Sequence, residues 1–152
     1  MEENEYRNTY HSVNPTQCVF EKSINSRRSQ CSLAHRFCLA DREGVSCTSN
    51  TAQQQCHGLL TVLREKARFA MKLTKVDGPL PHGKEVKVQM GSLLGLKKLL
   101  DIAGQENLEI SDIHRLLDLA VKKYAGEENI PYDQIMQEVV RFEGRRKRAQ
   151  RT

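Results

Sequence analysis

All five cysteines of this 152-residue chain lie between residues 18 and 56, at Cys18, Cys31, Cys38, Cys47 and Cys56. The first residues are acidic and contain no apolar run, so we expect no secretory signal and a cytoplasmic protein. Thiols stay reduced in the cytosol, and an odd number of cysteines fits poorly with a fully paired disulfide framework. The clustering therefore predicts metal ligation in preference to disulfide bonds.

The spacing of these cysteines bears on the kind of metal. Cysteine thiolates bind zinc or build iron–sulfur clusters. Structural zinc sites usually contain a close pair such as C-x2-C, whereas here the intervening segments have 12, 6, 8 and 8 residues. Wide spacing favours a larger cluster that bridges several structural elements. We expect a [4Fe–4S] cluster, with zinc as the alternative cofactor. A further alternative is that the cysteines only fill the core.

A helix predicted over residues 32–43 decides which four cysteines are the expected ligands. On one continuous helix, Cys31 and Cys38 would lie about 10.5 Å apart along the axis, too far to share a compact cluster. Cys31 falls in the break before this helix, whereas Cys38 falls in its middle between apolar neighbours. The predicted metal ligands are Cys18, Cys31, Cys47 and Cys56, with Cys38 and His35 in reserve.

Capping residues and apolar periodicity predict a mainly α-helical fold, a small multi-helix bundle with a Cys-rich N-terminal region and a basic tail. Aromatic residues make up only 5% of the chain, which favours helices packed through aliphatic side chains. The expected helices begin at Asn14-Pro15, cover 32–43 with Gly44 as the helix end, run from Asn50 to about Thr74, and cover 92–100, 111–126 and 131–140. A short strand is expected at 86–88. Gly91 to Gly95 resembles a glycine-rich turn, and close helix packing is the alternative.

The same signals divide the chain into five parts. Residues 1–13 form a polar N-terminal arm, and residues 14–76 form the Cys-rich helical metal-binding region. The prolines and glycines of residues 77–85 predict a hinge before a second helical region, 86–142. Residues 143–152 form the basic tail.

The basic tail accounts for the formal net charge of +5, because residues 141–152 hold six cations and one acid. Its densest run is Arg145, Arg146, Lys147 and Arg148, which could contact nucleic-acid phosphates or an acidic protein partner. The sequence contains no helix-turn-helix, zinc-finger or RNP signature, and the tail has no aromatic residue for stacking on bases. Nucleic acid is therefore a possible partner, not the leading expectation.

No Walker loop, Rossmann fingerprint or G-x-S-x-G motif is present, so an enzyme is the less favoured class. No apolar stretch is long enough to span a bilayer, and no membrane association is expected. The sequence favours an iron–sulfur accessory, electron-transfer or redox-sensing protein that acts within a larger assembly. The alternative is a nucleic-acid-associated regulator with a structural zinc or cluster site and a phosphate-binding tail.

Overall fold

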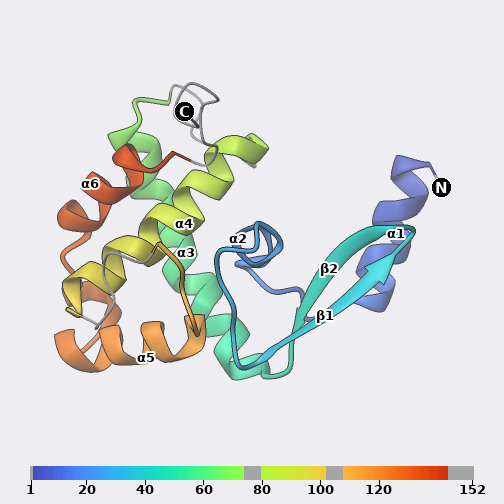
Figure 1. Ribbon diagram of the computed structural model, residues 1–152, viewed down its shortest axis with the longest axis horizontal. Coiled ribbons are helices and arrows are strands. Elements are labelled where there is room, and N and C mark those ends of the chain that lie inside the picture. Colours follow the sequence, from blue (N-terminus) through green and yellow to red (C-terminus); the bar gives the residue numbers. More distant parts are fainter. Residues whose placement is uncertain (1, 74–79, 102–107, 144–152) are drawn as a thin grey trace, which may run out of the picture.

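The computed structural model describes residues 2–73, 80–101 and 108–143, and this part of the chain is mainly helical (Figure 1). Its elements are α1 (Glu3–Val13), α2 (Glu21–Asn25), β1 (Ala34–Leu39), β2 (Arg42–Cys47), α3 (Asn50–Ala70), α4 (His82–Leu99), α5 (Ile113–Tyr124), a 3-10 turn (Glu127–Asn129) and α6 (Tyr132–Arg141). The helices α3 to α6 form one body. The hairpin β1–β2, with α1 packed on it, projects from this body to one side.

Helix α4 is the centre of the helical body. Residues 88–93 of this helix are buried without interruption, so it is covered on all sides, as expected for a helix without a polar face. Gly91 and Gly95 face the backbone of α6 at Val139 and Ile135, which lets the two helices pack closely. The sequence Gly91–Gly95 is therefore a helix-packing segment and not a turn.

One continuous set of buried side chains joins the Cys-rich segment to this helical body. Phe20, Ile24 and Val45 belong to the same hydrophobic cluster as Leu60 of α3 and Leu93 of α4. The predicted hinge does not separate two cores. Residues 77–79 of that hinge lie outside the described part of the chain, and His82–Glu85 form the first turn of α4.

The helix predicted over residues 32–43 is wrong, because the structure has the antiparallel hairpin β1–β2 there. Ala40 and Asp41 both have positive φ, 51° and 67°, which is the backbone of a two-residue hairpin turn. Ala34 pairs with Cys47 at the open end of the hairpin, and Leu39 pairs with Arg42 beside the turn. Gly44, which suggested a helix end, instead lies in β2 under the Phe37 ring.

The predicted helix start at Asn14 is also wrong. Residues 3–13 of the polar N-terminal arm form helix α1, and Asn14 ends this helix instead of starting the next one. The Asn14 side chain is buried and donates hydrogen bonds to the Val45 carbonyl at 3.0 Å and to the Tyr10 hydroxyl at 2.9 Å. These bonds attach α1 to the hairpin. The next helix, α2, begins only at Glu21.

Three of the expected helices are confirmed with small changes at their starts. Ser49 caps α3 by accepting a hydrogen bond from the Ala52 N–H, whereas the sequence suggested Asn50. Asp112 precedes α5, and Pro131 precedes α6 as expected. The strand at 86–88 is wrong, because α4 runs through it and includes most of the helix expected at 92–100. In the part of the chain that the structure describes, no helix combines the length and apolarity needed to cross a membrane.

Candidate metal centre

Four cysteines line one pocket where the open end of the hairpin meets the N-terminal ends of α3 and α5. These are Cys18, Cys31, Cys47 and Cys56, and each is partly buried. They come from four separate segments: the loop before α2, the loop before β1, the last residue of β2, and the second turn of α3. The remaining lining is largely apolar and includes Phe20 and Ile113.

Backbone hydrogen bonds bring Cys18 beside Cys47. The Cys18 N–H donates to the Val45 carbonyl at 3.0 Å, and the Cys47 N–H donates to the Thr16 carbonyl at 2.7 Å. Residues 16–18 therefore run antiparallel to the outer edge of β2, where Gln17 and Ser46 form an isolated bridge. The sequence predicted a helix that begins at Asn14-Pro15. Because residues 16–18 instead pair with β2, the helix α2 begins only at Glu21.

Cys31 is positioned by the segment that leads into α5. The Gln30 N–H donates to the Ile110 carbonyl, and the Ile113 N–H donates to the Gln30 carbonyl, both at 2.9 Å. The Ser32 N–H donates to the Asp112 carboxylate at 3.0 Å, and the Ser32 hydroxyl bonds to the same oxygen. Residues about 80 apart in the chain therefore meet next to the cysteine pocket.

Backbone N–H groups bring partial positive charge to two of the sulfurs. The N–H groups of Leu33 and His114 act to lower the pKa of Cys31 against the effect of burial, and His114 lies in the first turn of α5. The Phe20 N–H acts in the same direction on the pKa of Cys18. Such N–H donors stabilise a thiolate more than a thiol. Sequence analysis missed His114, because the capping residues located this helix start but nothing indicated that it faces Cys31.

Burial makes the thiol form strongly preferred in the metal-free pocket. Burial, together with the proximity of the other cysteines, raises the pKa of Cys18 and that of Cys56 to about 12. Burial likewise raises the pKa of Cys31. Placing several thiolates here thus requires a compensating positive charge.

The pKa of Asp112, which lies beside the cysteine pocket at the start of α5, is shifted downwards, unlike the pKa values of the cysteines. Burial acts to raise the pKa of this carboxyl, but hydrogen bonds from Ser32 and from the N–H groups of Arg115 and His114 outweigh it and lower the pKa. Asp112 is therefore an ionised residue that fixes the Cys31 loop against the start of α5.

The two reserve residues do not reach the pocket. Cys38 is exposed on β1, four residues along the strand from Ala34, which lies at the open end. At about 3.3 Å per residue, that places Cys38 roughly 13 Å along the hairpin from the pocket. His35 is exposed on the same strand and is not part of the lining. Cys38 is thus set apart by its place on a strand, and the helix-based reason for excluding it was wrong.

The basic residues Arg145, Arg146, Lys147 and Arg148 lie outside the described residues.

The space enclosed by the four thiols is small, about 20 Å³ for the centre of a water-sized sphere. Within residues 2–73, 80–101 and 108–143, no three His, Cys, Asp or Glu side chains form a group that could hold a metal ion as they stand. The pocket therefore brings four thiols together, without the tight grouping that one metal ion requires. Comparison with protein-family models, curated proteins and solved structures finds no match to the chain.

Proposed function

We propose that Cys18, Cys31, Cys47 and Cys56 ligate an iron–sulfur cluster of the [4Fe–4S] type. The protein would then act as an accessory, electron-transfer or redox-sensing component of a larger assembly. The observation that carries the proposal is the gathering of four cysteines from four segments around one pocket, while the fifth stays on an exposed strand. A cubane cluster takes four protein thiolates, which is the number available here.

The choice of a cluster over zinc rests on the spacing of the cysteines. The four sulfurs come from separated segments with no close Cys pair. A polynuclear cluster is wider than an ion, so its ligands stand farther apart.

The electrostatics of the pocket also suit a cationic inorganic core. The raised thiol pKa values oppose ionisation of the empty pocket, so the positive core must supply the stabilisation of the thiolates. Backbone N–H groups beside the Cys18 and Cys31 sulfurs act to lower the pKa of both thiols, which favours their ionised state. Hydrogen bonds to cluster sulfurs are among the features that set a reduction potential.

The position of the pocket suits a redox role. All four cysteines are only partly buried, so a cluster bound to them would lie near the protein surface. Such a cluster can exchange electrons with a docked partner, which is the chemistry it would supply. The four cysteines of this chain would hold it, and the apolar lining of the pocket would limit its contact with water.

The test is anaerobic purification of the full chain, followed by quantitation of iron, sulfide and zinc and by visible absorption spectroscopy. We expect brown protein with about four iron and four sulfide per chain. Replacing Cys31 or Cys56 with Ser should remove most of the iron and the colour. The matched control, Cys38→Ser, should retain both, because Cys38 lies outside the pocket.

A colourless wild-type protein with stoichiometric zinc would identify the alternative cofactor. A colourless protein with neither metal would leave the cysteines as core residues. Loss of iron in Cys38→Ser, to the same extent as in Cys31→Ser, would contradict the assignment of the four ligands.

A further inference from the structure

A polar cleft of about 240 Å³ adjoins the cysteine pocket and shares part of its wall, including Cys18 and Gln53. We propose that this cleft binds the oxyanion group of a small ligand, a phosphate or a carboxylate, through Lys22, His57 and Arg64. The three residues come from α2 and α3. The proposal concerns ligand binding in the cleft and does not depend on which metal the cysteines hold.

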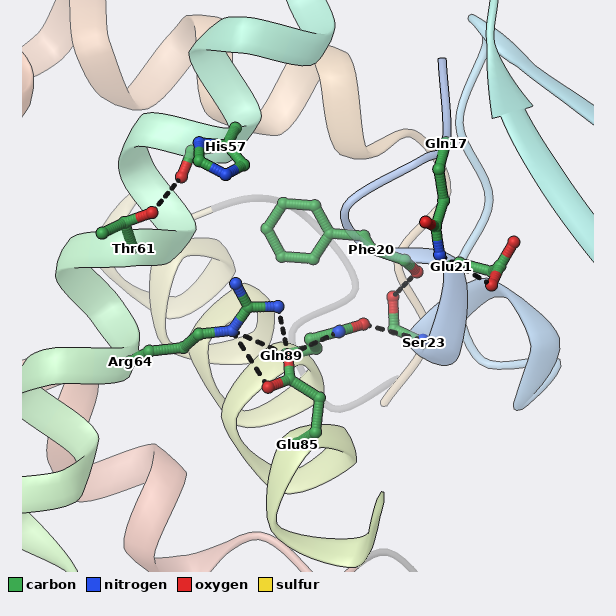
Figure 2. Close-up of polar contacts among 9 residues, drawn as sticks. All are labelled: Gln17, Phe20, Glu21, Ser23, His57, Thr61, Arg64, Glu85 and Gln89. Carbon is green, nitrogen blue, oxygen red and sulfur yellow. Dashed lines mark hydrogen bonds and ion pairs between the residues drawn. The ribbon is translucent and has the colours of Figure 1, made fainter. Parts of the chain in front are cut away.

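Arg64 is held in place by a buried network that reaches across three helices (Figure 2). Its Nε and Nη2 bond to the Glu85 carboxylate at 2.9 to 3.1 Å, and only 7% of the Glu85 side chain is exposed. The Gln89 amide donates to Glu85 at 2.7 Å and accepts from the Ser23 N–H at 3.1 Å. The guanidinium is therefore fixed before any ligand arrives, which lowers the entropic cost of binding.

The fixed guanidinium still has donor capacity. Its third nitrogen, Nη1, takes no part in the bonds to Glu85, and Figure 2 shows it pointing into the space between His57 and Phe20. The Arg64 side chain remains 30% exposed and is part of the cleft lining. A preorganised cationic donor at the edge of a cleft is suited to a charge-assisted bond with an oxyanion.

The other groups in the cleft also favour an acceptor ligand. Glu21 already accepts hydrogen bonds from the Tyr10 hydroxyl, the Val45 N–H and the Gln17 amide. Glu85 is paired with Arg64. In contrast, the Lys22 ammonium and the His57 imidazole have no partner among the described residues. Both carboxylates are satisfied and the free groups are donors, so the site is complementary to negatively charged oxygen.

The cleft also has room for more than a lone oxyanion. A second depression of about 370 Å³ adjoins it and shares the side chains of Lys22, Arg64 and Glu85. Lining from Thr61 and Leu80 gives that depression both hydroxyl and apolar surface. A phosphorylated or carboxylated metabolite could place its anionic group against Arg64 and the rest of the molecule there.

The test measures binding of inorganic phosphate and, separately, of succinate to the anaerobically purified full chain. Titration calorimetry gives the affinity, and the ¹H–¹⁵N resonance of Arg64 Nε reports whether the ligand occupies this cleft. Lys22→Gln removes the ammonium charge and His57→Ala removes the imidazole donor, and neither breaks a described side-chain bond, so both variants should fold. We expect each to weaken binding by about tenfold.

Lys84→Gln is the matched control, because Lys84 is an exposed cation on α4 that does not line the cleft. Its affinity should stay within about twofold of wild type, since a distant surface charge adds little. Saturable binding of either anion that moves the Arg64 resonance and fails in the Lys22 and His57 variants supports the proposal. The preferred anion identifies the ligand class. No saturable response to either anion in the high millimolar range overturns it, as does equal weakening by Lys84→Gln.

Discussion

The cysteine pocket and the α4–α6 contact are held together in different ways. Helices α4 and α6 meet through side chains that are almost fully buried, such as Leu93 and Ile135, and through glycines that allow close approach. The pocket is assembled by backbone hydrogen bonds between irregular segments, and its four sulfurs remain partly exposed. The helical contact consists of direct packing of side chains and backbone. The four cysteines, by contrast, lie on segments with fewer buried contacts, so a metal bound there, as proposed, should add most order at the pocket.

Metal removal is expected to have the largest effect and to act on one region only. Removing the metal with a chelator and an oxidant should lower the free energy of local unfolding at the pocket by about several kcal/mol. The reason is that the free energy of metal binding also stabilises the folded segments. Hydrogen exchange, followed by mass spectrometry, should accelerate in residues 15–33 and 44–56. It should change little in residues 88–97 and 132–140. Equal acceleration of exchange in both regions would show that they unfold as one unit. It would contradict the claim that the pocket and the α4–α6 contact are stabilised separately.

The second-largest effect is expected at the polar link between the two regions. Arg64→Ala leaves the Glu85 carboxylate buried without its cation, which should lower the free energy of unfolding by about 3 kcal/mol. Lys122→Ala is the control, since its pair with Asp118 is exposed and should contribute about 0.5 kcal/mol or less. Urea denaturation of both variants gives the comparison. Similar losses in the two variants would mean that the buried network does not stabilise the fold.

The third test addresses the close contact of α4 with α6. A Cβ at Gly91 would lie 2.6 Å from the Val139 Cα, and backbone cannot move aside as a side chain can. Gly91→Ala should therefore destabilise the protein by about 2 kcal/mol, although alanine is the better helix former. Gly83→Ala, in the first turn of the same helix, meets nothing within 4 Å and should stabilise by roughly 0.5 kcal/mol. An unchanged melting temperature for Gly91→Ala would show that α4 and α6 can move apart without loss of stability.

The difference between the two regions also explains what the sequence could predict. Helices α3, α5 and α6 carry local signals, namely capping residues and apolar periodicity, and these were sufficient to find them. The hairpin was missed because its strands are stabilised by partners outside the segment. Residues 16–18 pair with β2, and Tyr10 of α1 stacks near Phe37. Gly44 was read as a helix end because nothing local distinguishes that from a strand glycine under an aromatic ring.

The candidate site shows the same limit. The residue types and the clustering of the cysteines indicated a soft-metal site, but the reason given for setting Cys38 aside depended on a helix that does not exist. His114 and the network of Arg64, Glu85 and Gln89 gave no sequence signal, because each depends on contacts between distant segments. The sequence shows which residue types are present, but only the fold shows which of them lie together.

The smallest expected effect is a pH dependence confined to the metal-free pocket. The pKa of Cys18 and of Cys56 is about 12 in the folded state, above the ordinary thiol value, so the folded state holds these protons longer than the unfolded chain. Their contribution to stability is complete below about pH 9 and is lost as the pH rises from there towards 12. From pH 8 to pH 10 the loss should be about 1 kcal/mol for each thiol.

Denaturation of the metal-free protein at several pH values measures this loss, and comparison with Cys18→Ala isolates one thiol from the titration of lysines and tyrosines. The variant should show a shallower decline, whereas Cys38→Ser should follow wild type because Cys38 is exposed and outside the pocket. Metal-loaded protein should show the opposite trend in metal affinity, which rises with pH as thiols release their protons. An identical pH profile for wild type and Cys18→Ala would mean that this thiol is as well solvated in the folded chain as in the unfolded one, and the pocket would then be too open to shield a cluster from water.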